Sequence, residues 1–170
     1  MRISLDKFTK IIVMFIVAFF GTACISTSAD TKKPKNKIID QFFSGIEINT
    51  GSIPLQTLND SFEADPDGGP ILNQKVELFE LGDGECLSLV TLYNESGFGG
   101  YEDLLIFKRD KILVSLQRNL FFSKENGEVA KSDVKYDHNI DDSKNTKSIL
   151  KEDFDRYKIK FNTKVKSTCV

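Results

Sequence analysis

Apolar and polar positions divide the chain into three parts. Residues 11–20 form one uninterrupted apolar run, residues 25–37 are almost entirely polar, and apolar positions recur at short intervals from residue 38 onward. The polar stretch consists mainly of serine, threonine, proline and lysine, a composition typical of a solvated tether. Residues 38–170 carry enough apolar residues for one core, so the pattern predicts a single domain there.

Three short helices are predicted within this domain. Apolar residues in 38–43 fall on one helical face, and Gly45 can end that helix. Pro54 is typical of a helix start and predicts a second helix over residues 54–58. A third helix is predicted over residues 148–154.

The remaining pattern is that of short strands separated by turns. Strands are predicted over residues 76–81, 86–93, 104–107, 112–116 and 129–136, with turns at 82–84, 108–111 and 126–127 and loops at 65–70, 94–101 and 137–147. Residues 157–165 alternate most regularly between apolar residues and lysine, which predicts a last strand. The expected class is α+β: an antiparallel β-meander of five or six strands with two or three short helices packed on one face.

The N-terminal part has the pattern of an export signal. Arg2, Lys7 and Lys10 precede the apolar run, which is too short to cross a bilayer of about 30 Å as a helix. The run ends in Gly21-Thr22-Ala23-Cys24, which resembles the lipobox of bacterial lipoproteins, with glycine where that family most often has leucine. The resemblance implies a signal peptide over residues 1–23 and acyl chains such as palmitate on Cys24.

The same resemblance implies a place for the protein in the cell. Residues 24–37 would then be the lipidated cysteine and a flexible tether, and 38–170 the folded domain. Ile25 and Ser26 lack the aspartate that retains such proteins at the inner membrane, which implies an outer-membrane lipoprotein facing the periplasm. The alternatives are cleavage after Ala23 or Ala29, giving a soluble periplasmic or secreted protein, and an uncleaved anchor.

The two other cysteines are predicted to form a disulfide. If Cys24 carries lipid, Cys86 and Cys169 remain as a pair in an oxidising compartment, where disulfides persist. The alternative is two unpaired thiols. The cysteine spacing does not match that of a zinc site.

Charge is distributed very unevenly along the domain. Residues 38–107 contain thirteen acidic residues and one basic residue, Lys75, whereas residues 108–170 contain fifteen basic and ten acidic residues. This predicts either an acidic binding surface or acidic turns compensated by lysines across one sheet. The predicted partner-binding residues are Glu95, Phe98, Glu102 and Asp103, in and beside the glycine-rich segment 97–100. Nucleic acid is not an expected partner.

Catalytic and metal-binding patterns are weak. His138 is the only histidine and is expected on a surface loop. Asp137, Asn139 and Asp141 have the spacing of a calcium loop, but Asp142 replaces its glycine and Ser148 its glutamate. No enzyme activity, metal or cofactor is predicted.

The sequence therefore favours an exported, lipid-anchored envelope protein that acts as a non-catalytic binding module for a protein with a basic surface. An immunity-type inhibitor of a toxin is one form of that function. The alternatives are a structural accessory lipoprotein for envelope assembly and, less favoured, a carboxylate-dependent hydrolase.

Overall fold

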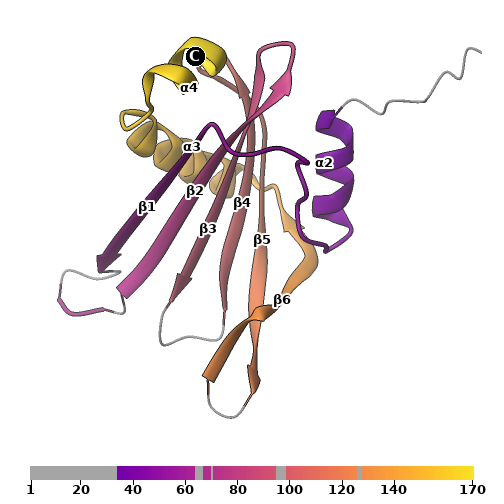
Figure 1. Cartoon of the computed structure of the whole chain (residues 1–170). Coiled ribbons are helices and arrows are strands. Elements are labelled where there is room, and N and C mark those ends of the chain that lie inside the picture. The colour runs from indigo at the N-terminus through magenta and orange to yellow at the C-terminus, as the bar shows by residue number, and fades with distance from the viewer. Residues whose placement is uncertain (1–33, 64–66, 70, 95–98, 126–127) are drawn as a thin grey trace, which may run out of the picture. The chain divides into compact units, whose positions relative to one another are not determined.

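The computed structural model describes residues 34–63, 67–69, 71–94, 99–125 and 128–170, and Lys32–Val170 forms one compact unit. The predictions for the signal peptide, for Cys24 and for the tether up to residue 33 lie outside the described residues, whereas residues 34–37, predicted as the end of the tether, begin a helix. The elements, drawn in Figure 1, are α2 (Pro34–Phe43), β1 (Gln56–Glu63), β2 (Ile71–Gly82), β3 (Glu85–Asn94), β4 (Gly99–Lys108), β5 (Lys111–Glu125), β6 (Glu128–Asp141), α3 (Lys144–Lys158) and α4 (Thr163–Cys169).

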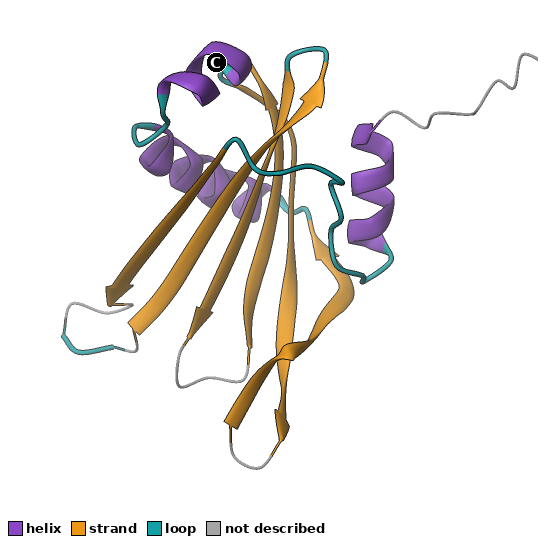
Figure 2. Ribbon diagram, in the orientation of Figure 1, coloured by secondary structure: helices purple, strands orange, loops and turns teal. Residues whose placement is uncertain are grey.

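The six strands form one antiparallel sheet in the order in which they follow one another along the chain. Each strand pairs with its sequence neighbours, so the sheet is a meander with β1 and β6 at its edges (Figure 2). This confirms the predicted α+β class.

Helices cover both faces of the sheet. α3 and α4 pack together on one face and contribute Leu150, Phe154 and Val165 to its apolar core. The prediction that the helices share one face does not hold for α2. α2 packs on the opposite face through Ile38 and Phe42. The connection from α2 to β1 crosses the sheet on the α2 side (Figure 1).

The strands serve two cores because alternate residues of a strand point to opposite faces. Val90 and Leu105 belong to the core under α3, whereas their neighbours Leu89 and Leu104 belong to the core under α2. β3 and residues 104–107 of β4 therefore read as nearly continuous apolar runs, as expected for central strands covered on both sides.

Two of the predicted hairpin turns are confirmed. Gly82, Asp83 and Gly84 join β2 to β3 and all have positive φ, of 98°, 54° and 71°. Arg109 and Asp110 join β4 to β5 with φ of 47° and 66°, the signs that a two-residue type I′ turn requires. The turn predicted at residues 126–127 lies outside the described residues.

The loop predicted over residues 94–101 is shorter than expected, because β3 extends to Asn94 and β4 begins at Gly99. A Cβ atom at Gly99 would overlap the carbonyl oxygen of Leu120, and one at Gly100 would overlap that of Leu92. These glycines therefore allow neighbouring strands to approach closely.

The helix predicted over residues 54–58 is wrong, because β1 begins at Gln56. Leu58 packs against the core under α3 from this edge strand, and Phe62 lies on the same face. The spacing of these two residues is even, which fits a strand rather than the helix that Pro54 suggested.

The strand predicted over residues 157–165 is also wrong: α3 ends at Lys158 and α4 begins at Thr163. The buried residues Phe154 and Tyr157 are three apart on α3, and Val165 and Cys169 are four apart on α4, as on helical faces, while Phe161 is buried in the connection between the two helices. Ile159, which supported the alternation, is 77% exposed.

Local hydrogen bonds favour the two helices over a strand. The side chain of Asn162 accepts a hydrogen bond from the backbone N–H of Val165 at 2.8 Å and so caps α4. The side chain of Ser143 caps α3 by accepting from Thr146 N. The helix predicted over 148–154 is thus confirmed and is longer than expected, and the loop predicted from residue 137 begins only after Asp141.

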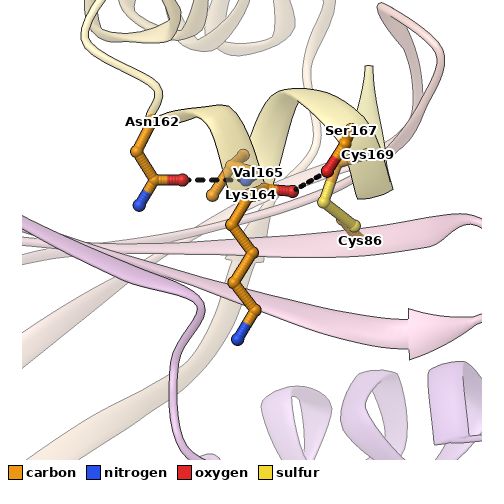
Figure 3. The surroundings of a disulfide bond; sticks show 6 residues. All are labelled: Cys86, Asn162, Lys164, Val165, Ser167 and Cys169. Atoms are coloured by element: carbon orange, nitrogen blue, oxygen red, sulfur yellow. Dashed lines mark hydrogen bonds between the residues drawn. A yellow bond between two sulfur atoms is a disulfide. The ribbon is translucent and has the colours of Figure 1, made fainter.

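Cys86 and Cys169 are joined by a disulfide, with a Cα–Cα distance of 5.7 Å (Figure 3). The bond connects the last residue of α4 to the start of the central strand β3. The backbone N–H of Arg109 also donates to Cys169 O at 3.0 Å. The C-terminal helix is therefore held against the sheet by a covalent bond and by a hydrogen bond to the β4–β5 turn.

Candidate functional site

A cleft of about 970 Å³ opens on the α2 face of the sheet. One wall is the connection between α2 and β1, residues 46–54, together with Gln41 of α2. The floor consists of residues from β2, β3, β4 and β6: Lys75, Glu77, Phe79, Leu89, Thr91, Glu102 and Tyr136. We call residues 46–54 the cleft wall and the whole site the α2-face cleft.

Beneath one end of the cleft lies a buried arginine. Arg118 of β5 is 1% exposed, and its Nε donates to Glu102 Oε2 on the adjacent strand at 2.6 Å. Its Nη1 donates to Phe42 O and its Nη2 to Ile46 O, both at 2.9 Å. The guanidinium carbon also lies 4.4 Å from the ring centroid of Phe42 and 4.0 Å from that of Tyr136.

Burial determines the protonation behaviour of this end of the cleft. Desolvation raises the pKa of Glu102, while the charge and hydrogen bond of Arg118 oppose that shift. Desolvation also raises the pKa of Tyr136 to about 12, and the nearby carboxylates of Glu102 and Glu47 act in the same direction. Glu47 therefore adds negative charge beside a carboxylate that Arg118 already neutralises.

The rim of the cleft is partly apolar and partly acidic. Ile46 is 50% exposed and Ile53 is 89% exposed, which is unusual for isoleucine. Glu47 is exposed and takes part in no ion pair among the described residues, whereas Glu77 pairs with Lys75 at 2.9 Å. Such a rim offers apolar contact and carboxylate acceptors to a ligand, with Phe79 and Leu89 beneath them.

The four residues predicted to bind a partner do not form one described surface. Glu95 and Phe98 lie outside the described residues. Glu102 is 3% exposed and Asp103 is 7% exposed, so the structure places both in the interior. They are adjacent in β4 and point to opposite faces, because successive strand residues alternate.

Asp103 lies on the α3 face and has a different environment from Glu102. Its Oδ1 accepts a hydrogen bond from Gln117 Nε2 at 2.8 Å. Desolvation raises its pKa to about 7, and the carboxylate of Asp153 on α3 adds to the shift. Nearby, Tyr157 Oη and Ser88 Oγ are 2.8 Å apart in the same interface.

The charge asymmetry of the sequence is partly compensated within the domain. Lys160 pairs with Asp60 at 2.7 Å and Lys35 with Glu85 at 3.4 Å, both near the surface. The pair of Arg118 and Glu102 compensates a third acidic residue in the interior. Several acidic residues remain exposed around the sheet, namely Glu47, Glu63, Glu80 and Asp83.

The other candidate motifs have local structural roles. Asp137 Oδ1 accepts from the N–H of Asn139, and Asp141 Oδ2 accepts from Thr146 Oγ1, so both carboxylates shape the end of β6 and the start of α3. His138 is exposed on β6, and a Cβ at Gly45 would meet its ring. Within the described residues, no group of three histidine, cysteine or acidic residues could hold a metal ion. Nor does any described helix have the length and apolar character needed to cross a membrane.

A second, smaller groove of about 500 Å³ lies on the α3 face, beyond the part that α3 covers. It is lined mainly by apolar residues, including Leu72, Leu92, Tyr101 and Phe121. Tyr101 and Phe121 are about half exposed. Among the described residues that line this groove there is no carboxylate, in contrast to the α2-face cleft.

Sequence reasoning missed Arg118 and the cleft wall. Arg118 occupies the same strand phase as Val114, Leu116 and Leu120, so a charged residue interrupts an apolar series. That interruption was a usable signal for a buried ion pair. The cleft wall has no periodic pattern, and only its position over the sheet identifies it.

Comparison of the chain with protein-family models, curated proteins and solved structures finds no match.

Proposed function

We propose that this chain is a non-catalytic, lipid-anchored binding module of the bacterial cell envelope, and that its α2-face cleft holds a segment of a protein with a basic surface. The observation that carries the proposal is the cleft itself. It combines Phe79 and Leu89 in its floor, two exposed isoleucines, and the carboxylate of Glu47, which has no ion pair within the described part of the chain. Lysine or arginine beside apolar residues complements such a surface.

The export pattern supports the envelope part of the proposal. A basic start, the apolar run 11–20 and Cys24 are the features of a lipoprotein signal, and the polar stretch before α2 would separate the domain from the membrane. A specific form of the function is immunity: an exported protein of this size would occupy the basic cleft of a toxin. The identity of the captured partner decides between immunity and another regulatory role.

The test is affinity capture from native envelope extracts, with mass spectrometry of the retained proteins. The full chain is compared with the double variant Glu47→Gln/Glu77→Gln. We expect at least one protein with a basic surface to be retained by the wild type at low salt, and to be lost with this variant. Raising the ionic strength should weaken its retention, because exposed charges are screened beyond about 10 Å at 0.1 M salt.

The matched control is Glu63→Gln/Glu80→Gln, which removes the same charge from exposed positions outside the cleft. It should retain the partner. Equal loss with both variants would contradict a specific cleft and indicate a general charge effect. Salt-resistant retention by all variants would instead support a structural accessory lipoprotein. The intact mass of the purified chain reports whether Cys24 carries lipid.

A further inference from the structure

One side chain joins three separate pieces of this domain. Arg118 lies on β5, and its guanidinium donates to a carboxylate on β4, to the carbonyl oxygen of Phe42 at the end of α2, and to that of Ile46 at the start of the cleft wall. Arginine can do this because its planar group presents five N–H donors in fixed directions. A lysine ammonium has three donors at one point and could not reach all three acceptors.

The environment of Arg118 makes these contacts hard to replace. The group is stacked between the rings of Phe42 and Tyr136, and its side chain is shielded from solvent. Water therefore cannot substitute for a lost donor, and the carbonyl oxygens of α2 and the wall would remain without that partner. Backbone carbonyls at the end of a helix need such partners from outside the helix.

The cleft wall has few other attachments to the sheet. Ile48 packs into the core under α2, and the N–H of Leu55 donates to Leu78 O where the wall reaches β1. Between these points Asn49 and Thr50 make hydrogen bonds within the wall itself, to Gly51 and Ser52. The wall is therefore attached to the sheet near its two ends. Within the described residues, Arg118 provides the polar attachment to the sheet at the first end, where the N–H groups of Ile46 and Asn49 also donate to Gln41 of α2.

We infer that Arg118 is the positioning residue of the α2-face cleft: it holds the beginning of the wall, and the end of α2, at a set place above the sheet. Its role in partner binding rests on the proposed function, but the positioning itself does not. Glu102 then serves to compensate the buried charge of Arg118. The pair supports the cleft from below, and neither residue needs to contact the partner.

The positioning role is tested by amide hydrogen exchange, measured residue by residue by NMR on the full chain with no ligand present. The informative amides are those of Ile46 and Asn49, both of which donate to Gln41, and the reference amides are those of α3. The variant Arg118→Met leaves Glu102 buried and unpaired. The double variant Arg118→Met/Glu102→Met removes both charges, which often restores stability.

In the double variant we expect exchange at Ile46 and Asn49 to accelerate roughly tenfold or more, since a hydrogen bond to a charged donor is commonly that strong. Exchange in α3 should stay near the wild-type rate. The matched control, Arg156→Gln, removes an exposed arginine that pairs with Asp153 and should change neither set. Wild-type exchange at Ile46 and Asn49 in the double variant would overturn the inference. So would equal acceleration in the wall and in α3, because Arg118 would then support the whole fold.

A second measurement separates this inference from the proposed function. The double variant is used in the envelope capture experiment described above. If the double variant loses the partner and its wall amides exchange faster, the result supports both the positioning role of Arg118 and partner binding in the cleft. Faster exchange with undiminished capture leaves the positioning role intact and contradicts binding in the cleft.

Discussion

On the face covered by α3 and α4 the main contacts are aromatic rings and a disulfide, whereas on the face covered by α2 they converge on one buried arginine. The ring centroids of Phe107 and Phe154 are 4.8 Å apart, and those of Phe154 and Tyr157 are 5.5 Å apart. Across the sheet, Arg118 links β4, α2 and the cleft wall. The contacts on the α3 face fill the interface between helices and sheet, whereas those of Arg118 on the α2 face lie beside the open α2-face cleft.

The adjacent residues Glu102 and Asp103 of β4 show the same difference between the two faces. Glu102 points to the α2 face and is paired with Arg118. Asp103 points to the α3 face, where its neighbours are Gln117, which donates a hydrogen bond, and Asp153, which repels it. The pKa of both is raised by burial, but only Glu102 has a cation that opposes the shift. The α2 face therefore holds a compensated charge and the α3 face an uncompensated one.

The largest expected effect concerns the disulfide of the α3 face. In the double variant Cys86→Ser/Cys169→Ser we expect the free energy of unfolding to fall by up to about 4–5 kcal/mol, because the bond constrains a long loop in the unfolded chain. The two cysteines are 83 residues apart. Urea unfolding followed by circular dichroism measures the change.

Cys24→Ser is the matched control for that experiment, because it removes a cysteine and leaves the pair intact. It should unfold like the wild type. A loss below about 1 kcal/mol in the double variant would show that apolar contacts such as that of Val165 are sufficient to hold α4.

The next effect is a pH dependence that originates on the α3 face. The native pKa of Asp103, about 7, lies above its ordinary value of 3.8, so between these values the folded state binds more protons than the unfolded state. Stability should therefore fall as the pH rises from about 4 to about 7 and change little from this group above that. The expected total is on the order of a few kcal/mol.

Asp103→Asn should remove this contribution while keeping the oxygen that accepts from Gln117. Glu102 also makes stability fall as the pH rises, in the wild type and in Asp103→Asn alike. The difference between the two plots of unfolding free energy against pH therefore isolates the contribution of Asp103. We expect the asparagine variant to be the more stable of the two at pH 8. Parallel curves from pH 4 to pH 8 would contradict a buried, uncompensated Asp103.

The smallest effect on stability is expected at the cleft rim. Ile53→Ser should change the free energy of unfolding by less than about 0.5 kcal/mol, because the side chain is almost fully exposed. It should nevertheless weaken capture of the partner by the α2-face cleft. Ile159→Ser, at a similarly exposed position between α3 and α4, is the control and should leave capture unchanged.

Local signals predicted much of the sheet correctly. The turns at 82–84 and 108–111 depend on a few residues that must adopt positive φ, and the central strand at 86–93 depends on a continuous apolar run. Both are properties of neighbouring residues. The antiparallel meander followed from short connections between consecutive strands.

The errors arose where two periods fit the same residues. Residues 157–165 alternate like a strand, but the neighbouring buried residues have helical spacing, Phe154 and Tyr157 on α3 and Val165 and Cys169 on α4. The caps at Ser143 and Asn162 and the packing of three aromatic rings against the sheet favour the helices. The acidic surface predicted at Glu102 and Asp103 failed because a charge count does not show which carboxylates are buried.

By itself the sequence determined the class of the domain and most of its strands, and it led to the predictions of a Cys86–Cys169 disulfide and of export. These follow from local periodicity, turn chemistry and the count of cysteines. Only the tertiary structure decided that α2 covers the opposite face, that Arg118 is buried beneath it, and that residues 46–54 form the wall of a cleft. The physical reason is that burial and compensation of charge depend on residues as far apart as Phe42 and Arg118, which local patterns cannot bring together.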